Sequence, residues 1–474
     1  MFKNFLWIFS EKGLITLLQF TTLLVLSRFL TPEDYGVYGV MMIFIAVSEM
    51  LIDSGFGGAL IQKRDITRVD ISTLFFTNIA ISLVLYGLIY VLSPLLESYY
   101  QIQNLATYFR VIGITIVIYA FSIVQNSLLI RNMQFKKSTI INCVSTLLSS
   151  IIAILLSILG CGIWALVFQL LANSIIMTIL LWINNRIIID FKISRNSFLH
   201  LWRFGSNLVF GNILQTIINN ICTSIIPKIG DVTKAGLYFQ SLKITNIPVN
   251  VLTLSIDKGV FPILSKEKNE YNICLKARLY NRSFLAFFIP LFPLLSISST
   301  PLIVLLLGNK WEAAGGYFSI LIWSGLGLMI QGLFRNIVKS IGDTSVIFRI
   351  EIYKSVITLA ILLASIKFGV IFIVYGYVIA SFIGAAIWSF ILSHKYSYTA
   401  SNQLEDTLKP IVATIIIYFL CLVTSQFCEG TWLLLISFLG YITYIFLGYF
   451  IHIEEISQLL LKSTNYIKKH VESK

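Results

Sequence analysis

Fourteen apolar stretches, each about 18 to 25 residues long, follow one another along almost the whole chain. A helix of about that length crosses a hydrocarbon core of ~30 Å. Hydrophobic residues make up 57% of the 474 positions and charged residues 12%, a balance unlike that of a soluble globule. Strand-like alternation is absent, so we predict an all-α polytopic membrane protein rather than a membrane β-barrel. The predicted spans are 12–30, 36–60, 72–94, 105–130, 138–159, 162–184, 205–229, 234–260, 281–306, 315–338, 346–366, 369–393, 409–427 and 430–451.

The positive charges define an orientation for these spans. If the N-terminus lies in the cytoplasm, the connections on that side and the C-terminal tail hold most of the 35 lysines and arginines. Basic residues are retained on the cytoplasmic side of membrane proteins. We therefore predict that both termini are cytoplasmic. The net charge of +13 then faces lipid headgroups, and no nucleic-acid partner is expected.

Little of the chain is left for soluble chemistry. The longest predicted segments between spans are 185–204 and 261–280, no P-loop glycine pattern occurs, and the six cysteines lack metal-ligand spacing. We predict no catalytic residues, no metal site and no cofactor, hence no enzyme. A membrane polymerase or ligase is a remote alternative because it would need a large charged outer loop. The longest predicted outer loop, 94–105, has Glu97 as its only charged residue.

A repeat with an offset of 200 residues organises the chain. The stretch LSRFLTPEDYGVYG at 26–39 returns as IPKIGDVTKAGLYF at 226–239, which aligns Arg28 with Lys228 and Gly36 with Gly236. Six spans separate the copies, so both copies run in the same direction through the membrane. This predicts two six-helix lobes related by a parallel repeat, followed by two C-terminal helices. Transporters with such repeats place a substrate path between the lobes.

The repeat divides the chain into five predicted parts. They are an N-terminal lobe (1–184), a cytoplasmic linker (185–204), a C-terminal lobe (205–393), helices thirteen and fourteen (394–452) and a cytoplasmic tail (453–474). Within the linker, FLHLWRF at 198–204 is expected to lie as a helix in the membrane interface. Pro32 to Gly36 is expected to form the outer hairpin after the first span, since proline cannot continue a helix and glycine frees the backbone.

Several longer motifs keep their order along the chain. They include LIDSGFGGALIQKRD at 51–65, LWRFGSNLVFGNIL at 201–214 and FRNIVKSIGDTS at 334–345. In these motifs and in the repeated stretch the chain resembles the bacterial polysaccharide transporters, the O-antigen and exopolysaccharide flippases of the multidrug/oligosaccharidyl-lipid/polysaccharide exporter superfamily. The resemblance covers nearly the whole chain. It departs at 220–222, where Asn-Ile-Cys stands in place of the Asn-x-Asp that such proteins often carry.

The resemblance implies a flippase. It implies export of undecaprenyl-pyrophosphate-linked oligosaccharide from the inner to the outer leaflet of the bacterial cytoplasmic membrane by alternating access, for O-antigen, capsule or exopolysaccharide synthesis. The implied partners are the lipid-linked oligosaccharide and membrane lipids, with a polysaccharide polymerase and chain-length machinery as further candidates. An ion-coupled drug or cation antiporter of the same superfamily is the alternative.

A substrate of this kind needs cations for its pyrophosphate inside the membrane. Arginine offers a forked, permanently charged guanidinium, and lysine offers a point charge. Arg335 and Lys339 are one helical turn apart, so they share a face. For every candidate the alternative is a side chain that snorkels to the headgroups. The substrate-binding candidates are Arg28, Arg110, Lys228, Lys243, Arg335 and Lys339.

Three carboxylates are candidates for ion coupling. Glu49 and Asp53 are one turn apart in the second span, and Asp257 holds the matching place in the repeat. Intramembrane carboxylates that take up a proton or sodium let a transporter use an ion gradient. For Asp53 and Asp257 the alternative is a helix cap or an ion pair at the cytoplasmic helix end.

Single cysteines in a variant without the native ones test the orientation. A cysteine at Glu33 should react with an impermeant thiol reagent in cells whose outer membrane is permeabilised, because this position is predicted to lie outside. A cysteine at Lys136 should react only after lysis. The reverse labelling pattern would overturn the orientation.

Overall fold

The computed structural model describes residues 2–53, 60, 66–184, 190, 193–267 and 269–458. Over these residues the regular elements are all helices, and ten of them are long and apolar enough to cross a membrane. The predicted all-α polytopic membrane fold is therefore confirmed. The chain divides into two compact units, Met1–Phe239 (unit 1) and Gln240–Lys474 (unit 2), which are described separately below.

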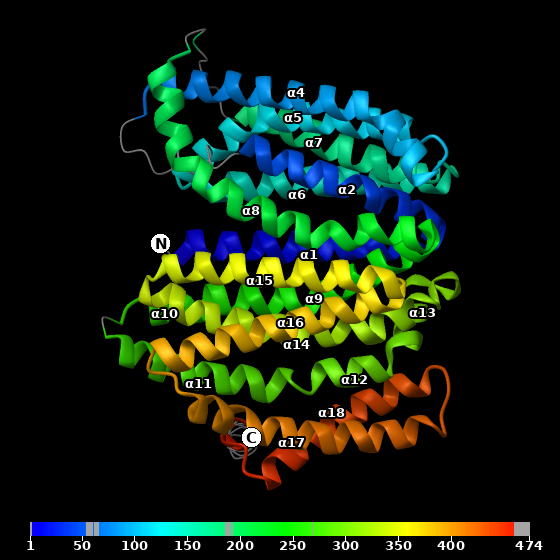
Figure 1. The fold of residues 1–474 in the computed structure, drawn as a ribbon, viewed down its shortest axis with the longest axis vertical. Coiled ribbons are helices and arrows are strands. Elements are labelled where there is room, and N and C mark those ends of the chain that lie inside the picture. The colour runs from blue at the N-terminus through cyan, green and yellow to red at the C-terminus, as the bar shows by residue number, and fades with distance from the viewer. Residues whose placement is uncertain are drawn as a thin grey trace, which may run out of the picture. The chain divides into compact units, whose positions relative to one another are not determined.

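Unit 1 is a bundle of long helices. Figure 1 shows α4, α5 and α7 side by side, and α6 packs against both α7 and α1. The helix α8 packs against α2 and α4. The helices that begin in unit 1 are α1 (Phe2–Phe29), α2 (Pro32–Asp53), α4 (Arg68–Tyr100), α5 (Leu105–Arg131), α6 (Phe135–Ile158), α7 (Trp164–Asn184), α8 (Arg195–Ile229) and α9 (Val232–Ser255).

The helix boundaries follow the 200-residue offset. The helix α1 ends at Phe29 and α8 ends at Ile229, while α2 begins at Pro32 and α9 begins at Val232. The predicted outer hairpin at Pro32 to Gly36 is wrong, because these residues form the first turn of α2. Proline is accepted at the first helical position, where its missing N–H would have no partner anyway.

A capping arrangement starts α2 directly after a two-residue connection. The Thr31 N–H and hydroxyl both donate to Asp34 Oδ2 at 2.8 Å, and the Asp34 N–H donates to the Thr31 hydroxyl at 3.3 Å. This reciprocal pairing satisfies N–H groups that the first helical turn leaves open. The sharp reversal of the chain therefore needs only Leu30 and Thr31.

The two repeated glycines serve a close helix crossing rather than a turn. A Cβ atom on Gly36 would fall on the carbonyl of Val232, and one on Gly236 would fall on the carbonyl of Pro32. The two contacts are related by the same 200-residue offset. Because glycine lacks a Cβ, the backbones of α2 and of the first turns of α9 approach closely at this crossing within unit 1.

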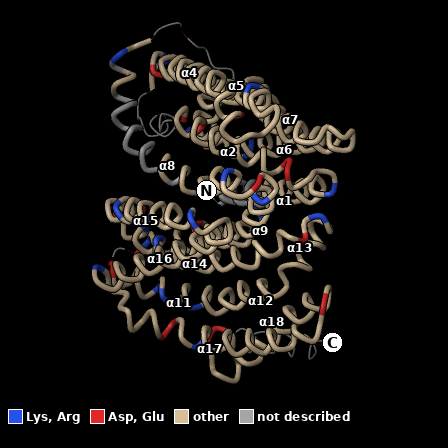
Figure 2. The backbone as a smooth tube through the Cα atoms, turned by 45° about the vertical axis from the view of Figure 1, so that its right-hand side comes forward, with Lys and Arg blue, Asp and Glu red and all other residues tan. Residues whose placement is uncertain are grey.

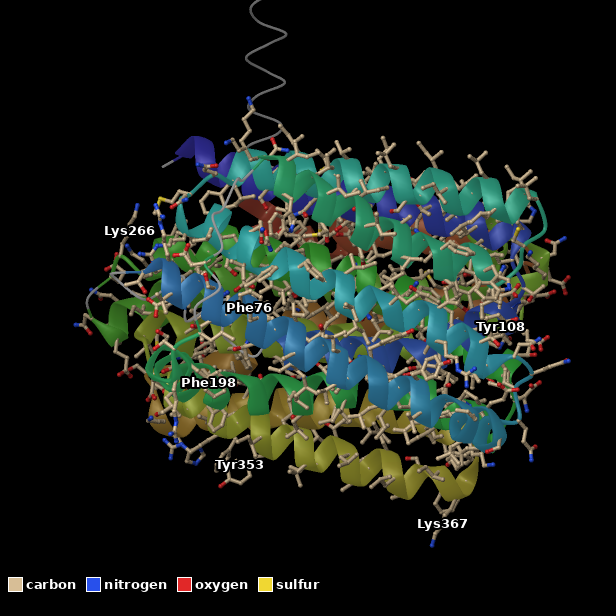
Figure 3. The ribbon with its side chains drawn as sticks, turned by 90° about the horizontal axis from the view of Figure 1, so that it is seen from above. Phe76, Tyr108, Phe198, Lys266, Tyr353 and Lys367 are labelled. Carbon is tan, nitrogen blue, oxygen red and sulfur yellow. The ribbon has the colours of Figure 1, made fainter. Side chains whose placement is uncertain are left out.

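Two further helices extend beyond their predicted boundaries. The outer loop expected at 94–105 is shorter, since α4 continues through Pro94 to Tyr100. Pro94 cannot donate to the carbonyl of Tyr90, and the Ser93 hydroxyl donates there instead at 2.8 Å. The interfacial helix expected at 198–204 is the beginning of α8. Its Phe198, labelled with Phe76 in Figure 3, packs against a hydrophobic cluster that includes Phe75.

Unit 2 is arranged around α14, which packs against α11, α12, α13, α15 and α16. Figure 2 shows the charged residues mainly near the helix ends, and Figure 3 shows Lys266 and Lys367 at opposite ends of this unit. The helices of unit 2 are α10 (Phe261–Leu264), α11 (Glu270–Phe288), α12 (Leu291–Ile297), α13 (Ser299–Leu307), α14 (Ala314–Ile341), α15 (Thr344–Ser365), α16 (Val370–Lys395), α17 (Ala400–Ser425) and α18 (Trp432–Phe450).

The span predicted at 281–306 is broken into α11, α12 and α13. Pro290 has no N–H, so the carbonyl of Ala286 loses its helical partner. The Tyr444 hydroxyl of α18 donates to this carbonyl at 2.7 Å, and the Tyr441 hydroxyl donates to the next one, of Phe287, at 2.9 Å. The helix α18 therefore supplies the hydrogen bonds that the break requires inside a membrane.

An ionic network ties α11 to α17. The guanidinium of Arg278 donates to both carboxylate oxygens of Asp406 at 2.9 and 3.0 Å, and the Tyr398 hydroxyl donates to the same carboxylate at 2.8 Å. The Asp406 side chain is 1% exposed. Because a buried carboxylate needs several donors, these partners anchor the two C-terminal helices to unit 2.

The glycine crossing is testable by adding one methyl group. Gly236→Ala should lower the apparent melting temperature in detergent, because the methyl group meets backbone atoms that cannot rotate away. Overpacking of this kind costs about 1–3 kcal/mol. Gly87→Ala in α4 is the control, since a Cβ there meets nothing within 4 Å. Equal melting of the two variants would show that the backbones do not touch.

Candidate functional site

The candidate cations of unit 1 lie near the ends of helices. Arg28 is exposed in the last turn of α1. Arg110 is half-buried in α5, where its Nε donates to the Ser93 hydroxyl at 3.3 Å and its guanidinium lies 4.5 Å from the ring centre of Tyr90. Lys228 is exposed at the end of α8, and its ammonium donates to the Tyr99 carbonyl at 2.9 Å.

Two of these cations are held by aromatic residues of α4. The Lys228 ammonium also lies 4.6 Å from the ring centre of Tyr99, as Arg110 lies over Tyr90. Cation–π contacts and aromatic rings at helix ends are typical of side chains that anchor a protein at the membrane interface. Arg28, Arg110 and Lys228 remain predicted substrate contacts. The contacts of Arg110 and Lys228 with tyrosine rings are also those expected of side chains that hold a helix end at the membrane interface.

The two acidic candidates of unit 1 share one face of α2. Glu49 and Asp53 are half-buried, and the described part of the chain offers neither carboxylate a hydrogen bond or an ion pair. The hydroxyl of Tyr119 in α5 lies within electrostatic range of both carboxylates. Unpaired carboxylates in a membrane are costly, so a proton or a metal cation is the expected partner.

Three candidate cations belong to unit 2, and their surroundings differ. Lys243 is half-buried within α9. Arg335 is half-buried on α14, and no described residue gives it a hydrogen bond or an ion pair. Lys339, one turn further along α14, lies 3.1 Å from Asp257 Oδ1. A half-buried guanidinium without a carboxylate is costly, and the role of Arg335 as a substrate contact stays a prediction.

The structure brings Asp257 and Lys339 together although 82 positions separate them. Asp257 Oδ1 also accepts a hydrogen bond from the Asn336 amide at 3.2 Å. Sequence reasoning missed Asn336, because an asparagine among apolar residues has no distinguishing spacing. The predicted substrate cation and the predicted ion-coupling acid thus form one cluster, defined here as Asp257, Asn336 and Lys339.

The carboxylate of Asp343, which follows Lys339 in the chain, holds the end of α14 in place. Asp343 accepts from the Val346 N–H at 3.3 Å and so caps α15. Its other oxygen accepts from the Lys395 ammonium at 2.5 Å, at the end of α16. The Lys395 ammonium and the Ser345 hydroxyl lower the pKa of Asp343 below its ordinary value. The turn after Lys339 is therefore held in place by its own ion pair.

The described residues thus form a polytopic α-helical membrane protein that carries this charged cluster in unit 2. The profile of the family described as "Polysaccharide biosynthesis protein" matches residues 25–315, more than half of the chain. The chain belongs to this family, and the predicted family resemblance is confirmed.

Two curated relatives align over most of their length. The succinoglycan biosynthesis transport protein ExoT of Rhizobium meliloti (strain 1021) is 24% identical over 81% of this chain and 76% of its own. The teichuronic acid biosynthesis protein TuaB of Bacillus subtilis (strain 168) is 24% identical over 86% of this chain and 85% of its own.

Solved structures show the same fold at low identity. The lipid II flippase MurJ in an inward closed conformation has a TM-score of 0.77 at 16% identity and covers 94% of this chain and 99% of its own. An inward-facing multidrug resistance MATE family transporter of the MOP superfamily has a TM-score of 0.61 at 16% identity, over 79% of this chain and 92% of its own.

Proposed function

We propose that this protein is a flippase that moves undecaprenyl-pyrophosphate-linked oligosaccharide from the inner to the outer leaflet of the bacterial cytoplasmic membrane. The oligosaccharide would serve the synthesis of O-antigen, capsule or exopolysaccharide. Transport proceeds by alternating access, with both termini in the cytoplasm. Membership of the polysaccharide biosynthesis protein family supports this proposal. The relatives named for succinoglycan transport and teichuronic acid biosynthesis support it too.

The observation that carries the proposal is the pair of cations on α14. Arg335 is half-buried and no described residue neutralises it, and Lys339 lies one turn away on the same face. Two cations at this spacing suit a pyrophosphate, which has two phosphate groups. A drug or cation antiporter would gain nothing from an unpaired arginine, because like charges repel.

Energy for transport is assigned to the carboxylates of α2. Glu49 and Asp53 would bind the coupling proton or sodium ion, since they are half-buried and have no ion pair among the described residues. Arg28, Arg110, Lys228 and Lys243 would accompany the pyrophosphate or the sugar elsewhere on the path. The lipid tail would remain in the bilayer, so the protein has to shield only the polar head.

Deletion of the gene tests the direction of transport. Lipid-linked oligosaccharide should then accumulate on the cytoplasmic leaflet, where an external glycosidase cannot reach it until the cells are lysed. Re-expression of the protein should restore access to the enzyme. Normal surface polysaccharide in a deletion strain without a paralogue would reject the flippase assignment.

Substitutions at Arg335 test its role as a phosphate contact. Arg335→Gln should lower substrate affinity about ten- to hundredfold, the loss expected when a hydrogen bond to a charged group disappears. Arg335→Lys should retain part of the affinity, because the charge survives without the guanidinium fork. The measurement is export rate against substrate concentration at equal membrane abundance.

The matched control is Lys367→Gln, in the short helix Ile366–Phe368 at the α15–α16 connection. It removes the same charge at a helix end, where a snorkelling side chain is dispensable. Equal export by the Arg335→Gln and Lys367→Gln variants would contradict the phosphate role of Arg335.

A further inference from the structure

Lys339 already forms an ion pair, with Asp257 of the same unit. Its ammonium lies 3.1 Å from Asp257 Oδ1 and 4.5 Å from the ring centre of Phe261. The side chains of Lys339 and Asp257 are 43% and 34% exposed. An ion pair that is this accessible is weak, because water and salt screen it. Another anion can therefore compete for the same ammonium.

The backbone beneath Asp257 has an unusual form. Residues Ile256–Val260 form one turn of π-helix, in which the Phe261 N–H donates to the Ile256 carbonyl five residues earlier. This turn and the short helix α10 both contact α14. A single π turn widens a helix at a cost and is found frequently at functional sites. The wider turn carries Asp257, and Phe261, the other side chain that contacts the Lys339 ammonium, directly follows it as the first residue of α10.

Asn336 gives the carboxylate a second partner. Its amide donates to the same Asp257 oxygen at 3.2 Å, and the residue is only 3% exposed. If the Lys339 ammonium leaves, Asp257 keeps this hydrogen bond and is not left without a donor. A polar group left without any hydrogen-bond partner costs more free energy than one that keeps a partner. The hydrogen bond from Asn336 therefore lowers the free-energy cost of separating Asp257 from Lys339.

We propose that Asp257 is a built-in competitor of the substrate at Lys339. This inference rests on the proposed flippase function. A pyrophosphate that binds Arg335 displaces the Asp257 carboxylate from Lys339 and takes the ammonium for its second phosphate. The carboxylate then remains on Asn336. Without substrate, Asp257 neutralises Lys339 and keeps other phosphates of the inner leaflet from binding the two cations together.

The competition predicts opposite effects for two substitutions. Binding of inorganic pyrophosphate to the purified full-length protein in detergent is the measurement, by calorimetry at fixed ionic strength. Asp257→Asn should tighten binding about two- to fivefold, because an exposed ion pair of modest strength no longer has to be broken. Lys339→Gln should weaken binding about tenfold or more, because a charge-assisted contact is lost.

Glu351→Gln is the matched control. Glu351 forms an ion pair with Lys354 in α15 of the same unit, so this substitution also removes a carboxylate from a lysine. It should leave pyrophosphate affinity unchanged. Equal tightening by Asp257→Asn and Glu351→Gln would overturn the proposal, since the effect would then be a general one of charge. Unchanged or weaker binding by Asp257→Asn would overturn it as well.

A lipid headgroup has the same phosphate chemistry and is tested separately. The variants are reconstituted in nanodiscs of phosphatidylglycerol or of phosphatidylcholine, and pyrophosphate binding is measured again. Tightening by Asp257→Asn in phosphatidylcholine supports the proposal. The tightening should be smaller in phosphatidylglycerol, because without Asp257 the headgroup phosphates also reach Lys339. No tightening in phosphatidylcholine, or a larger tightening in phosphatidylglycerol, would overturn the proposal.

The binding result is independent of the flippase test. If the deletion strain accumulates inner-leaflet oligosaccharide and the Asp257→Asn variant binds pyrophosphate like the wild type, only the competitor role of Asp257 is rejected. If the variants behave as expected and the deletion has no effect on the leaflet distribution, the proposed flippase function falls instead.

Discussion

Backbone hydrogen bonding is the constraint on which the rest of this structure depends. Inside a hydrocarbon layer no water replaces a missing partner, so each irregularity of a helix needs a donor from the protein. Ser93 supplies it beside Pro94, and Tyr444 supplies it where Pro290 interrupts the chain between α11 and α12. In the second case the hydroxyl groups come from α18, which packs against α12 at the break in the ninth span.

The same constraint limits how helices approach. Association in a membrane depends on close packing, which small residues permit. Gly36 and Gly236 allow backbone contact within unit 1, and their 200-residue offset makes the contact nearly symmetric. In unit 2, Gln331 donates to the Ser381 carbonyl at 2.7 Å, and Gly384 leaves room for the Gln331 side chain. The glycines of unit 1 thus permit close packing, and the Gln331 side chain of unit 2 finds a hydrogen-bond partner that lipid cannot provide.

Local sequence signals predict much of this fold, because hydrophobic length and turn residues act over short distances. The spans and the parallel repeat could be predicted, and the offset even placed the junctions after Phe29 and Ile229 correctly. Prolines were the main source of error. Pro32 starts a helix because Thr31 and Asp34 cap it, and Pro94 lies within one because Ser93 compensates. A proline alone therefore does not mark the end of a helix, as Pro94 inside α4 shows.

The sequence predicts individual residues of the candidate site, but it does not predict which of them lie close together in space. Asp257 and Lys339 were candidates for different roles, and only the packing of the π turn on α14 brings them together. No spacing rule links residues 82 positions apart. Asn336 lies in the motif FRNIVKSIGDTS, but nothing in that motif indicates the carboxylate that it contacts.

The charged side chains of unit 2 differ in how completely they are paired with opposite charges. Asp406 is buried with Arg278, and Asp343 is bound by Lys395 and by the first turn of α15. Asp406 is 1% exposed and accepts hydrogen bonds from both Arg278 and Tyr398, so Arg278 is not available to a ligand. The side chains of Lys395 and Asp343 are 47% and 26% exposed, so this pair is as accessible as that of Lys339 and Asp257. Under the proposed function, a phosphate that binds α14 meets Arg335, which has no partner among the described residues, and Lys339, whose ion pair is accessible. Binding there would replace a missing or weak interaction rather than a strong one.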